Sequence, residues 1–585
     1  MSSTPKTDVP ADLEAQDSQD SKESIKKLEQ ASPRKISPAA DSYEADPEDG
    51  REDGSTEELV KAKPSPSHRL LRRVFTIILI WALIAYSIAA YVISWPSPNA
   101  TALLVMECVA MFIFLCSYIG RRHSKEITAF LSSTEQFFYD MGRKTAFKVI
   151  VIVVLAAAIL AIVLYEVWGE FERLISACGL VFFIAAGYLF SWKRKHVNWR
   201  PVVWGFLLQF VFAYIILQTD WGRSAFTFLG EQVTAFLNYS QAGAEFLFGY
   251  LSKPLEISPD LTLFAPFAFF VLPLIIFFSA VTFILYYLGV LQAVIEVIAR
   301  VMALTMGTSA SESLNAAGNI FIGQTEAPLL VRPFLKDMTM SELHAVMTGG
   351  FSTIAGSVLG AYISFGVPAE HLLAASIMSA PAALALSKLI YPETEESKTK
   401  STADKPIEVA PDEASNVIEA ATNGTTVAVT LVANIAAMLI AFLAILAALN
   451  NWVGFFGRLV GWEEASFDRL VGYLMYPVAC IMGVPLVDCE RVGYLIGIKV
   501  FANEFVAYLK LAEFITAGNL TKRAEVIATY ALCGFSNFAS LGVQVGGLSP
   551  MAPNRKKDLT TLVFSAMIGG NMACFMTACI AGFFS

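Results

Sequence analysis

The sequence predicts an all-α protein that crosses a membrane many times. Of its 585 residues, 55% are hydrophobic and only 16% are charged, whereas a soluble protein carries charge on about a quarter of its residues. Several apolar runs are about 20 residues long, the length at which a helix crosses a hydrocarbon layer about 30 Å thick. We therefore expect about 11 transmembrane helices and two re-entrant hairpins, with the lipid bilayer as a partner.

The N-terminal residues 1–69 differ from the rest of the chain. They are rich in Ser, Pro, Asp, Glu and Lys and poor in aromatic residues, so they cannot bury enough apolar surface to fold alone. We expect a disordered cytoplasmic tail here, with no signal peptide before the first span. The net charge of −9 gives no reason to expect nucleic acid as a partner.

The cysteines and histidines do not indicate a metal site or a disulfide framework. The chain has eight Cys and five His. No cysteine pair has CxxC spacing, and the histidines form no cluster with the spacing of metal ligands. We expect no cofactor.

The first predicted spans are the apolar runs at 75–95, 101–119, 147–168, 174–192 and 202–218. Basic clusters lie at 68–73, 121–125 and 193–196. Because positive charge favours the cytoplasmic side of a membrane, all three clusters are consistent with a cytoplasmic N-terminus. The same rule places the basic residues at 554–558 inside and the C-terminus outside.

The remaining predicted segments alternate between apolar and amphipathic character. Amphipathic pieces of this kind lie along a membrane interface. In order, they are an interfacial helix at 221–251, a span at 263–288, an interfacial helix at 292–306, a region rich in small polar residues at 318–387, a polar linker at 391–426, a span at 427–449, an amphipathic piece at 452–470 and a second region rich in small polar residues at 473–584.

The two regions rich in small polar residues resemble each other. In the first, Glu326 is followed by the triplet Gly350-Phe351-Ser352. In the second, Glu504 is followed by Gly534-Phe535-Ser536. An odd number of crossings separates the two regions, so the second copy should be inverted in the membrane. Inverted repeats with interrupted helices are typical of transporters.

Glu326 is the first candidate for a functional residue. A carboxylate at membrane depth costs about 2.5 to 3.5 kcal/mol on insertion scales, so it needs a partner. That partner could be a ligand, a cation, a helix N-terminus, or Arg332 nearby. Gln324, Thr325 and Glu326 together offer an amide, a hydroxyl and a carboxylate at a helix break, which suits an uncharged solute that forms hydrogen bonds and does not suit an anion. The competing structural interpretation is that Glu326 pairs with Arg332 or caps the hairpin tip.

Glu504 poses the same problem in the second region. Here Lys499 and Lys510 are nearby and offer a structural alternative, an ion pair. If neither carboxylate had a partner, burying both at membrane depth would use up a large part of a domain's net stability, which is about 5 to 15 kcal/mol.

The second triplet carries further candidates. Asn537 and Ser540 are one helical turn apart and share a face, with Phe535 close by. An asparagine can bond sugar hydroxyls, and an aromatic ring can stack on a planar ring. The alternative is that these small residues serve only close helix packing.

A cation site is predicted beside the first break. Asn319 precedes the break, and Thr353 with the carbonyl of Ile354 follows the matching break in the next helix. Oxygen ligands combined with unwound backbone carbonyls hold sodium in transporters of this kind. A proton carried by Glu326 is the rival interpretation.

At this level of detail the chain resembles a known family. The segments "GQTEAPLLVRPFL", "SELHAVMTGGFSTIAGSVLGAYISFGVP", "NEFVAYL" and "ALCGFSNFASLGVQVGGLSPMAPNRKKDL" closely resemble those of the concentrative nucleoside transporters. The resemblance runs from about residue 204 to the C-terminus, and the three earlier spans are similar to the extra helices of animal members. It implies a homotrimer in the plasma membrane, in which each protomer has a mobile transport domain that moves like an elevator on a scaffold domain.

The resemblance also implies a division into domains. We expect the tail at 1–69, the extra helices and start of the scaffold at 70–200, scaffold and interfacial helices at 201–306, the first repeat of the transport domain at 307–390, a cytoplasmic linker at 391–426, a scaffold helix and an interfacial helix at 427–468, and the second repeat at 469–585.

Residue by residue, the resemblance assigns roles to the candidates. Gln324, Thr325 and Glu326 match residues that contact the nucleobase. Glu504 matches the residue that contacts the ribose. The remaining matches are Phe535, Asn537 and Ser540 around base and ribose, and Asn319 and Thr353 with the carbonyls of Ile322 and Ile354 at a sodium site. The residue pairs Gly323-Gln324 and Thr353-Ile354 are together similar to those of family members that accept both purine and pyrimidine nucleosides.

The expected function is therefore sodium-coupled import of nucleosides such as uridine and adenosine. Proton coupling of the same substrates is the first alternative. A membrane-embedded enzyme with paired carboxylates is a second, although the chain shows no supporting histidine beside the carboxylates, no metal cluster and no nucleophile elbow of the kind that such chemistry usually needs. A binding protein without transport is a third, but a receptor has no need of two mirrored half-sites.

Overall fold

The computed structural model describes residues 78–107 with gaps, 171–253, 255–258, 261–263, 266–398 and 414–585. The predicted tail, the span at 147–168, most of the span at 101–119 and the centre of the linker lie outside these residues. The chain divides into two compact units, 1–128 and 129–585. In the first unit, a short apolar helix covers Ile84–Ser94, and Tyr91 donates a hydrogen bond to Glu107 over 2.8 Å.

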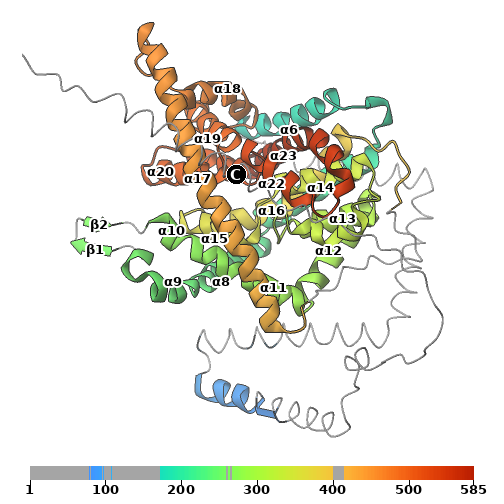
Figure 1. Cartoon of the computed structure of the whole chain (residues 1–585), viewed down its shortest axis with the longest axis vertical. Helices are drawn as coiled ribbons and strands as arrows, with labels where there is room; N and C mark the ends of the chain where they lie inside the picture. Colours follow the sequence, from blue (N-terminus) through green and yellow to red (C-terminus); the bar gives the residue numbers. More distant parts are fainter. Residues whose placement is uncertain are drawn as a thin grey trace, which may run out of the picture. The chain divides into compact units, whose positions relative to one another are not determined.

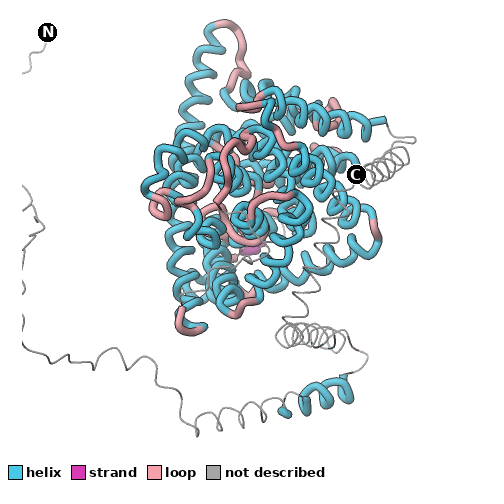
Figure 2. Tube along the Cα trace, turned by 90° about the vertical axis from the view of Figure 1, so that its right-hand side faces the viewer, coloured by secondary structure: helices cyan, strands magenta, loops and turns pink. Residues whose placement is uncertain are grey.

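The second unit is built almost entirely of helices (Figure 2). In chain order they are α6 (Phe171–Leu189), η2 (Arg194–His196), α7 (Trp199–Gln218), α8 (Asp220–Leu237), α9 (Ser240–Phe248), η3 (Gly249–Ser252), α10 (Phe267–Phe270), α11 (Leu272–Tyr287), α12 (Val290–Met306), α13 (Ala310–Gly318), η4 (Ala327–Phe334), α14 (Met340–Ser352), α15 (Gly356–Ser364), α16 (Ala369–Ile390), α17 (Val417–Leu459), α18 (Phe467–Ile481), α19 (Cys489–Phe501), α20 (Glu504–Thr516), α21 (Lys522–Leu532), α22 (Phe538–Leu548), η5 (Pro553–Arg555) and α23 (Lys556–Phe584).

The predicted helical class is confirmed, with one small exception. Strands β1 (Leu255–Ser258) and β2 (Leu261–Leu263) form an antiparallel hairpin in which Leu255 pairs with Leu263. Among the described residues, 7 helices are long and apolar enough to cross a membrane. They include the predicted spans at 174–192, 202–218, 263–288 and 427–449.

Two helical segments differ in extent from the sequence prediction. The interfacial helix expected at 221–251 is split into α8 and α9, because the chain turns at Asn238 and Tyr239. Conversely, α17 is a single helix of 43 residues that runs beyond the predicted span at both ends. Asn416 caps its start by accepting from the N–H of Glu419, and the helix contains no Pro to stop it. Figure 1 shows α17 (orange) running alongside α11.

The order of elements repeats along the chain. A long helix (α11), an amphipathic helix (α12), two short segments meeting at a break (α13, η4), two half-helices (α14, α15) and a closing helix (α16) come first. The same order returns in α17, α18, α19 with α20, α21 with α22, and α23. The two triplets that suggested a repeat stand at the ends of α14 and α21, next to the corresponding breaks.

The closing helices α16 and α23 form the core between the two repeats. Most of their residues are buried, and many are Ala, Gly or Ser. A Cβ added at Gly570 in α23 would lie 2.5 Å from Cβ of Phe351, so only a glycine lets α23 approach α14 this closely. The hydroxyls of Ser379 and Thr577 join the two closing helices over 3.1 Å. This packing positions the two helix breaks for the site described next.

Candidate functional site

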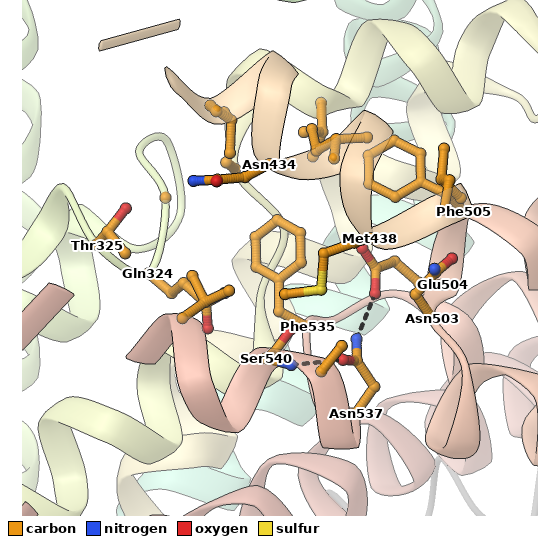
Figure 3. Close-up of a pocket in the computed structure, with 18 of the residues that line it drawn as sticks. Gln324, Thr325, Asn434, Met438, Asn503, Glu504, Phe505, Phe535, Asn537 and Ser540 are labelled. Atoms are coloured by element: carbon orange, nitrogen blue, oxygen red, sulfur yellow. Dashed lines mark hydrogen bonds between the residues drawn. The ribbon is translucent and has the colours of Figure 1, made fainter. Parts of the chain in front are cut away.

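The breaks of both repeats meet around one cavity (Figure 3). It has an empty volume of about 750 Å³ and is partly open. Every residue predicted to contact the substrate lines it: Gln324, Thr325, Glu326, Glu504, Phe535, Asn537 and Ser540. The prediction that two distant acidic residues meet in one place therefore agrees with the geometry.

The tip of the first hairpin carries Glu326. Helix α13 ends at Gly318, and the chain turns back into η4, which starts at Ala327. The Glu326 carboxylate accepts from the N–H of Gly323 over 3.1 Å, so it does cap the tip as the structural alternative proposed. No ion pair joins it to Arg332 in the part of the chain that the structure describes. The last turn of α14 packs closely against this tip at Gly350. A side chain there would not fit, because an added Cβ would lie only 2.8 Å from Cβ of Gln324.

The second hairpin places Glu504 in the first turn of α20. Asn503 caps this helix by accepting from the N–H of Val506 over 3.0 Å. The Glu504 carboxylate then accepts from Nδ2 of Asn537 over 2.7 Å and from the hydroxyl of Tyr362 over 3.3 Å. The positive end of a helix dipole adds to these two donors. The buried carboxylate is therefore held by two side-chain donors at a helix N-terminus.

The two lysines near Glu504 bond elsewhere. Nζ of Lys499 donates to the carbonyl of Ala531 over 3.2 Å, and Lys510 pairs with Glu513 over 2.7 Å. Among the described residues neither lysine forms an ion pair with Glu504, whose carboxylate bonds Asn537 and Tyr362 instead.

The break between α21 and α22 supplies the aromatic and amide groups. The Oδ1 atom of Asn537 accepts from the N–H of Ser540 over 2.8 Å and caps α22. Because Oδ1 is used in this way, Nδ2 is directed to Glu504. Phe535 is buried at 8% exposure and lies in the middle of the cavity wall in Figure 3. This arrangement combines a ring for stacking with polar groups at a fixed orientation.

The residues predicted for sodium lie behind the cavity. Asn319, Ile322, Thr353 and Ile354 are all buried, and they do not line the cavity. Both polar atoms of the Asn319 side chain are buried without a hydrogen-bond partner among the described residues. A cation held here would satisfy the Oδ1 atom.

Asn319 and Thr353 each contact Gly349. The Thr353 hydroxyl donates to the carbonyl of Gly349 over 3.0 Å, and a Cβ added at Gly349 would lie 2.9 Å from Nδ2 of Asn319. The helix ends at Thr353, so the carbonyl of Ile354 lies in unwound backbone between α14 and α15. An amide oxygen, a hydroxyl and free carbonyls are the donor set that a hard cation prefers, so these residues fit sodium.

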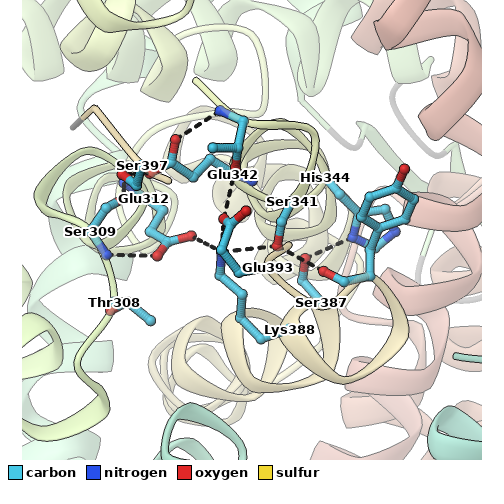
Figure 4. A network of polar contacts seen from close by, with 12 residues as sticks. Thr308, Ser309, Glu312, Ser341, Glu342, His344, Ser387, Lys388, Glu393 and Ser397 are labelled. Carbon is cyan, nitrogen blue, oxygen red and sulfur yellow. Dashed lines mark hydrogen bonds and ion pairs between the residues drawn. The ribbon is translucent and has the colours of Figure 1, made fainter. Parts of the chain in front are cut away.

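A buried charge network holds the first repeat together at the other end of these helices (Figure 4). Nζ of Lys388, in the last turn of α16, lies 2.7 Å from Glu312 and 3.5 Å from Glu393. It also donates to Ser341 over 3.0 Å. Lys388 therefore joins α13, α14 and the segment after α16.

The carboxylates of this network also cap helices. Glu312 accepts from the N–H of Ser309 over 2.6 Å at the start of α13, and Glu342 accepts from the N–H of Thr339 over 2.9 Å at the start of α14. Nearby, the ring of His344 bonds Ser387 over 2.7 Å. Sequence reasoning missed this network, although a lysine in the last turn of a long apolar helix was a usable signal.

Sequence reasoning also missed several residues that line the cavity or contact Glu504. Tyr362 contacts Glu504 from α15, and Asn503 and Phe505 flank Glu504. From α17 come Asn434 and Met438. Asn434 was visible as an amide within an apolar span, but nothing in the sequence says what such a residue faces.

Comparison with known proteins gives consistent matches. Residues 178–251 match the family model described as "Na+ dependent nucleoside transporter N-terminus", residues 268–369 match "Nucleoside recognition", and residues 371–582 match "Na+ dependent nucleoside transporter C-terminus". Solute carrier family 28 member 3 of Eptatretus stoutii is 44% identical over 531 residues, which are 88% of this chain and 75% of that protein. Sodium/nucleoside cotransporter 2 of Rattus norvegicus is 42% identical over 529 residues, 88% of this chain and 77% of that protein.

Solved structures match as well. CNTnw in an inward-facing substrate-bound state superposes with a TM-score of 0.65 at 38% identity, covering 71% of this chain and 98% of that one. A variant of CNTnw in an outward-facing state gives a TM-score of 0.66 at 38% identity, covering 71% and 99%.

Proposed function

The chain belongs to the Na+-dependent nucleoside transporter family, and on that premise we propose that it imports purine and pyrimidine nucleosides across the plasma membrane, coupled to sodium. The family consists of transporters, and this chain is a transporter, not an enzyme. Sodium is the coupling ion of the family. The named substrates, uridine and adenosine among them, are part of the proposal.

The observation that supports this function best is the shared cavity of Glu326 and Glu504. A nucleoside is uncharged, with sugar hydroxyls at one end and a planar base at the other. Glu504 would accept from the ribose hydroxyls, and Asn537 and Ser540 lie beside it. Gln324 and Thr325 would bond the edge of the base, and Phe535 would stack on its face.

Sodium bound by Asn319, Thr353 and the carbonyls of Ile322 and Ile354 would supply the driving force. One cation moving inward gains about 2.3 kcal/mol per 100 mV, and a tenfold gradient adds about 1.4 kcal/mol. Together these could concentrate a neutral nucleoside several hundred-fold per ion. Positive charge behind the first hairpin would also offset the charge of Glu326 and favour movement of the loaded site.

We further propose an elevator movement within a homotrimer. CNTnw has been solved in inward-facing, outward-facing and intermediate states, and this chain matches these states about equally well. The mobile part would comprise both hairpins and both broken helices, while α17 would belong to the fixed scaffold. The N-terminus would be cytoplasmic and the C-terminus extracellular, as the basic clusters predict.

The function is tested by uptake of radiolabelled uridine and adenosine in cells that express the chain. Sodium and pH are varied independently, with choline replacing sodium. We expect accumulation above the external concentration only with sodium present. Full accumulation in choline at fixed pH would indicate proton coupling, and a lack of net uptake under all conditions would contradict nucleoside import.

A further inference from the structure

Helix α17 presents one face to the cavity. The residues of α17 that line it are Leu431, Asn434, Ile435, Met438 and Leu439. Their spacing of three, four, seven and eight positions places them on one side of a helix. Four of the side chains are apolar, so Asn434 is the polar exception on this wall.

The amide of Asn434 is unsatisfied by the protein. The hydrogen bonds of the described residues include none to its side chain, and the residue is exposed and lines the cavity. Thr430, one turn earlier, instead satisfies its hydroxyl within the helix by donating to the carbonyl of Thr426 over 3.4 Å. An amide within an apolar span normally finds a partner, and because Asn434 lines the cavity, a solute bound there can supply that partner.

The direction of Asn434 indicates which part of a solute it would meet. In Figure 3 its amide points toward the end of the cavity with Gln324 and Thr325, while Glu504 lies at the other end. Phe535 lies between the two ends in the same view. A solute that stacks on Phe535 with its sugar toward Glu504 would therefore turn the edge of its base toward Asn434.

We propose that Asn434 forms a hydrogen bond with the edge of the nucleobase and so determines base specificity. The inference rests on the proposed function, because it presumes that a nucleoside occupies the cavity. A carboxamide carries both a donor and an acceptor. Since the side chain has no protein partner to hold it, the amide can turn either group toward the base and serve purine and pyrimidine edges alike.

The inference is tested with Asn434→Ala and a panel of nucleosides. The panel contains uridine, cytidine and adenosine, base analogues that each lack one ring nitrogen or exocyclic group, and 2′- and 3′-deoxy analogues as sugar controls. We expect the apparent affinity for the parent nucleosides to fall about tenfold. At least one base analogue should be transported equally by wild type and variant, because its missing group is the one that Asn434 bonds.

Three comparisons make the test specific. The loss caused by each deoxy analogue should be the same in wild type and variant. Thr430→Ala, on the same helix but outside the cavity lining, should leave the panel unchanged. Asn434→Ser also lacks the amide and replaces the alanine variant if that variant fails to reach the membrane. If the variants reach the membrane and transport every nucleoside of the panel as the wild type does, Asn434 has no role in base specificity. The proposed function would still stand. Absence of nucleoside uptake by the wild type overturns the proposed function, and this inference with it.

Discussion

The side-chain amide of Asn537 donates a hydrogen bond to Oε2 of Glu504 over 2.7 Å, while its oxygen accepts from the N–H of Ser540 over 2.8 Å. One asparagine therefore caps α22 and holds the carboxylate at the start of α20. Glu504 and Asn537 are both buried, where a hydrogen bond to a charged group is stronger than in water. The second hairpin and the second helix break are thereby joined at the cavity.

Glu504→Gln should abolish concentrative uptake. The substitution keeps the size of the side chain but removes the charge that Asn537 and Tyr362 bond. A hydrogen bond to a charged group contributes about 1.5 to 3 kcal/mol, so nucleoside affinity should fall at least about tenfold. Sodium-driven uridine accumulation and surface expression are measured together. Glu513→Gln is the control, because Glu513 lies on the same helix but is exposed and paired with Lys510. Normal accumulation by the Glu504 variant would remove this residue from the mechanism.

Glu326→Gln should also abolish concentrative uptake, for a different reason. Glu326 is held by the N–H of Gly323, and its charge would be offset by a cation bound behind the hairpin. Without that charge, we expect sodium to lose its effect on nucleoside binding while the protein still reaches the surface. The measurement is uridine binding and accumulation over a range of sodium concentrations. Glu296→Gln serves as control, since that carboxylate is exposed and paired with Arg300. A sodium dependence equal to that of the wild type would contradict the role of Glu326.

Much of this arrangement could be predicted from the sequence. Long apolar runs predicted the helical class, and the two Gly-Phe-Ser triplets predicted the repeat whose breaks surround the cavity. The continuation of α17 to Leu459 was not predicted, because a drop in hydropathy after 449 indicates where a membrane ends and not where a helix ends. The partnership of Lys388 with Glu312 was equally out of reach, since one sequence does not show which distant charges meet.

Thr353→Val should weaken sodium binding selectively. The substitution preserves shape but removes the hydroxyl that donates to the carbonyl of Gly349. We expect the sodium concentration for half-maximal uptake to rise about tenfold, equivalent to about 1.4 kcal/mol, with uptake recovering at high sodium. Ser352→Ala is a matched control, because the Ser352 hydroxyl donates to the same Gly349 carbonyl over 3.1 Å but is not a predicted ligand. Equal sodium dependence in wild type and Thr353→Val would exclude the hydroxyl as a ligand.

Lys388→Met should destabilise the folded protein without touching the cavity. The lysine is buried with Glu312 at 2.7 Å, and removing it leaves that carboxylate without its counter-charge. Breaking a buried ion pair in this way costs about 3 to 5 kcal/mol. We expect a lower melting temperature for the purified protein and less of it at the cell surface.

Two further variants separate this effect from a general loss of charge. Lys510→Met removes a lysine from an exposed pair with Glu513, and such pairs contribute about 0 to 1 kcal/mol, so its melting temperature should stay close to that of the wild type. Combining Lys388→Met with Glu312→Gln should recover part of the lost stability, because no uncompensated carboxylate then remains at that position. If Lys388→Met melts at the same temperature as Lys510→Met, the network does not hold α13, α14 and α16 together.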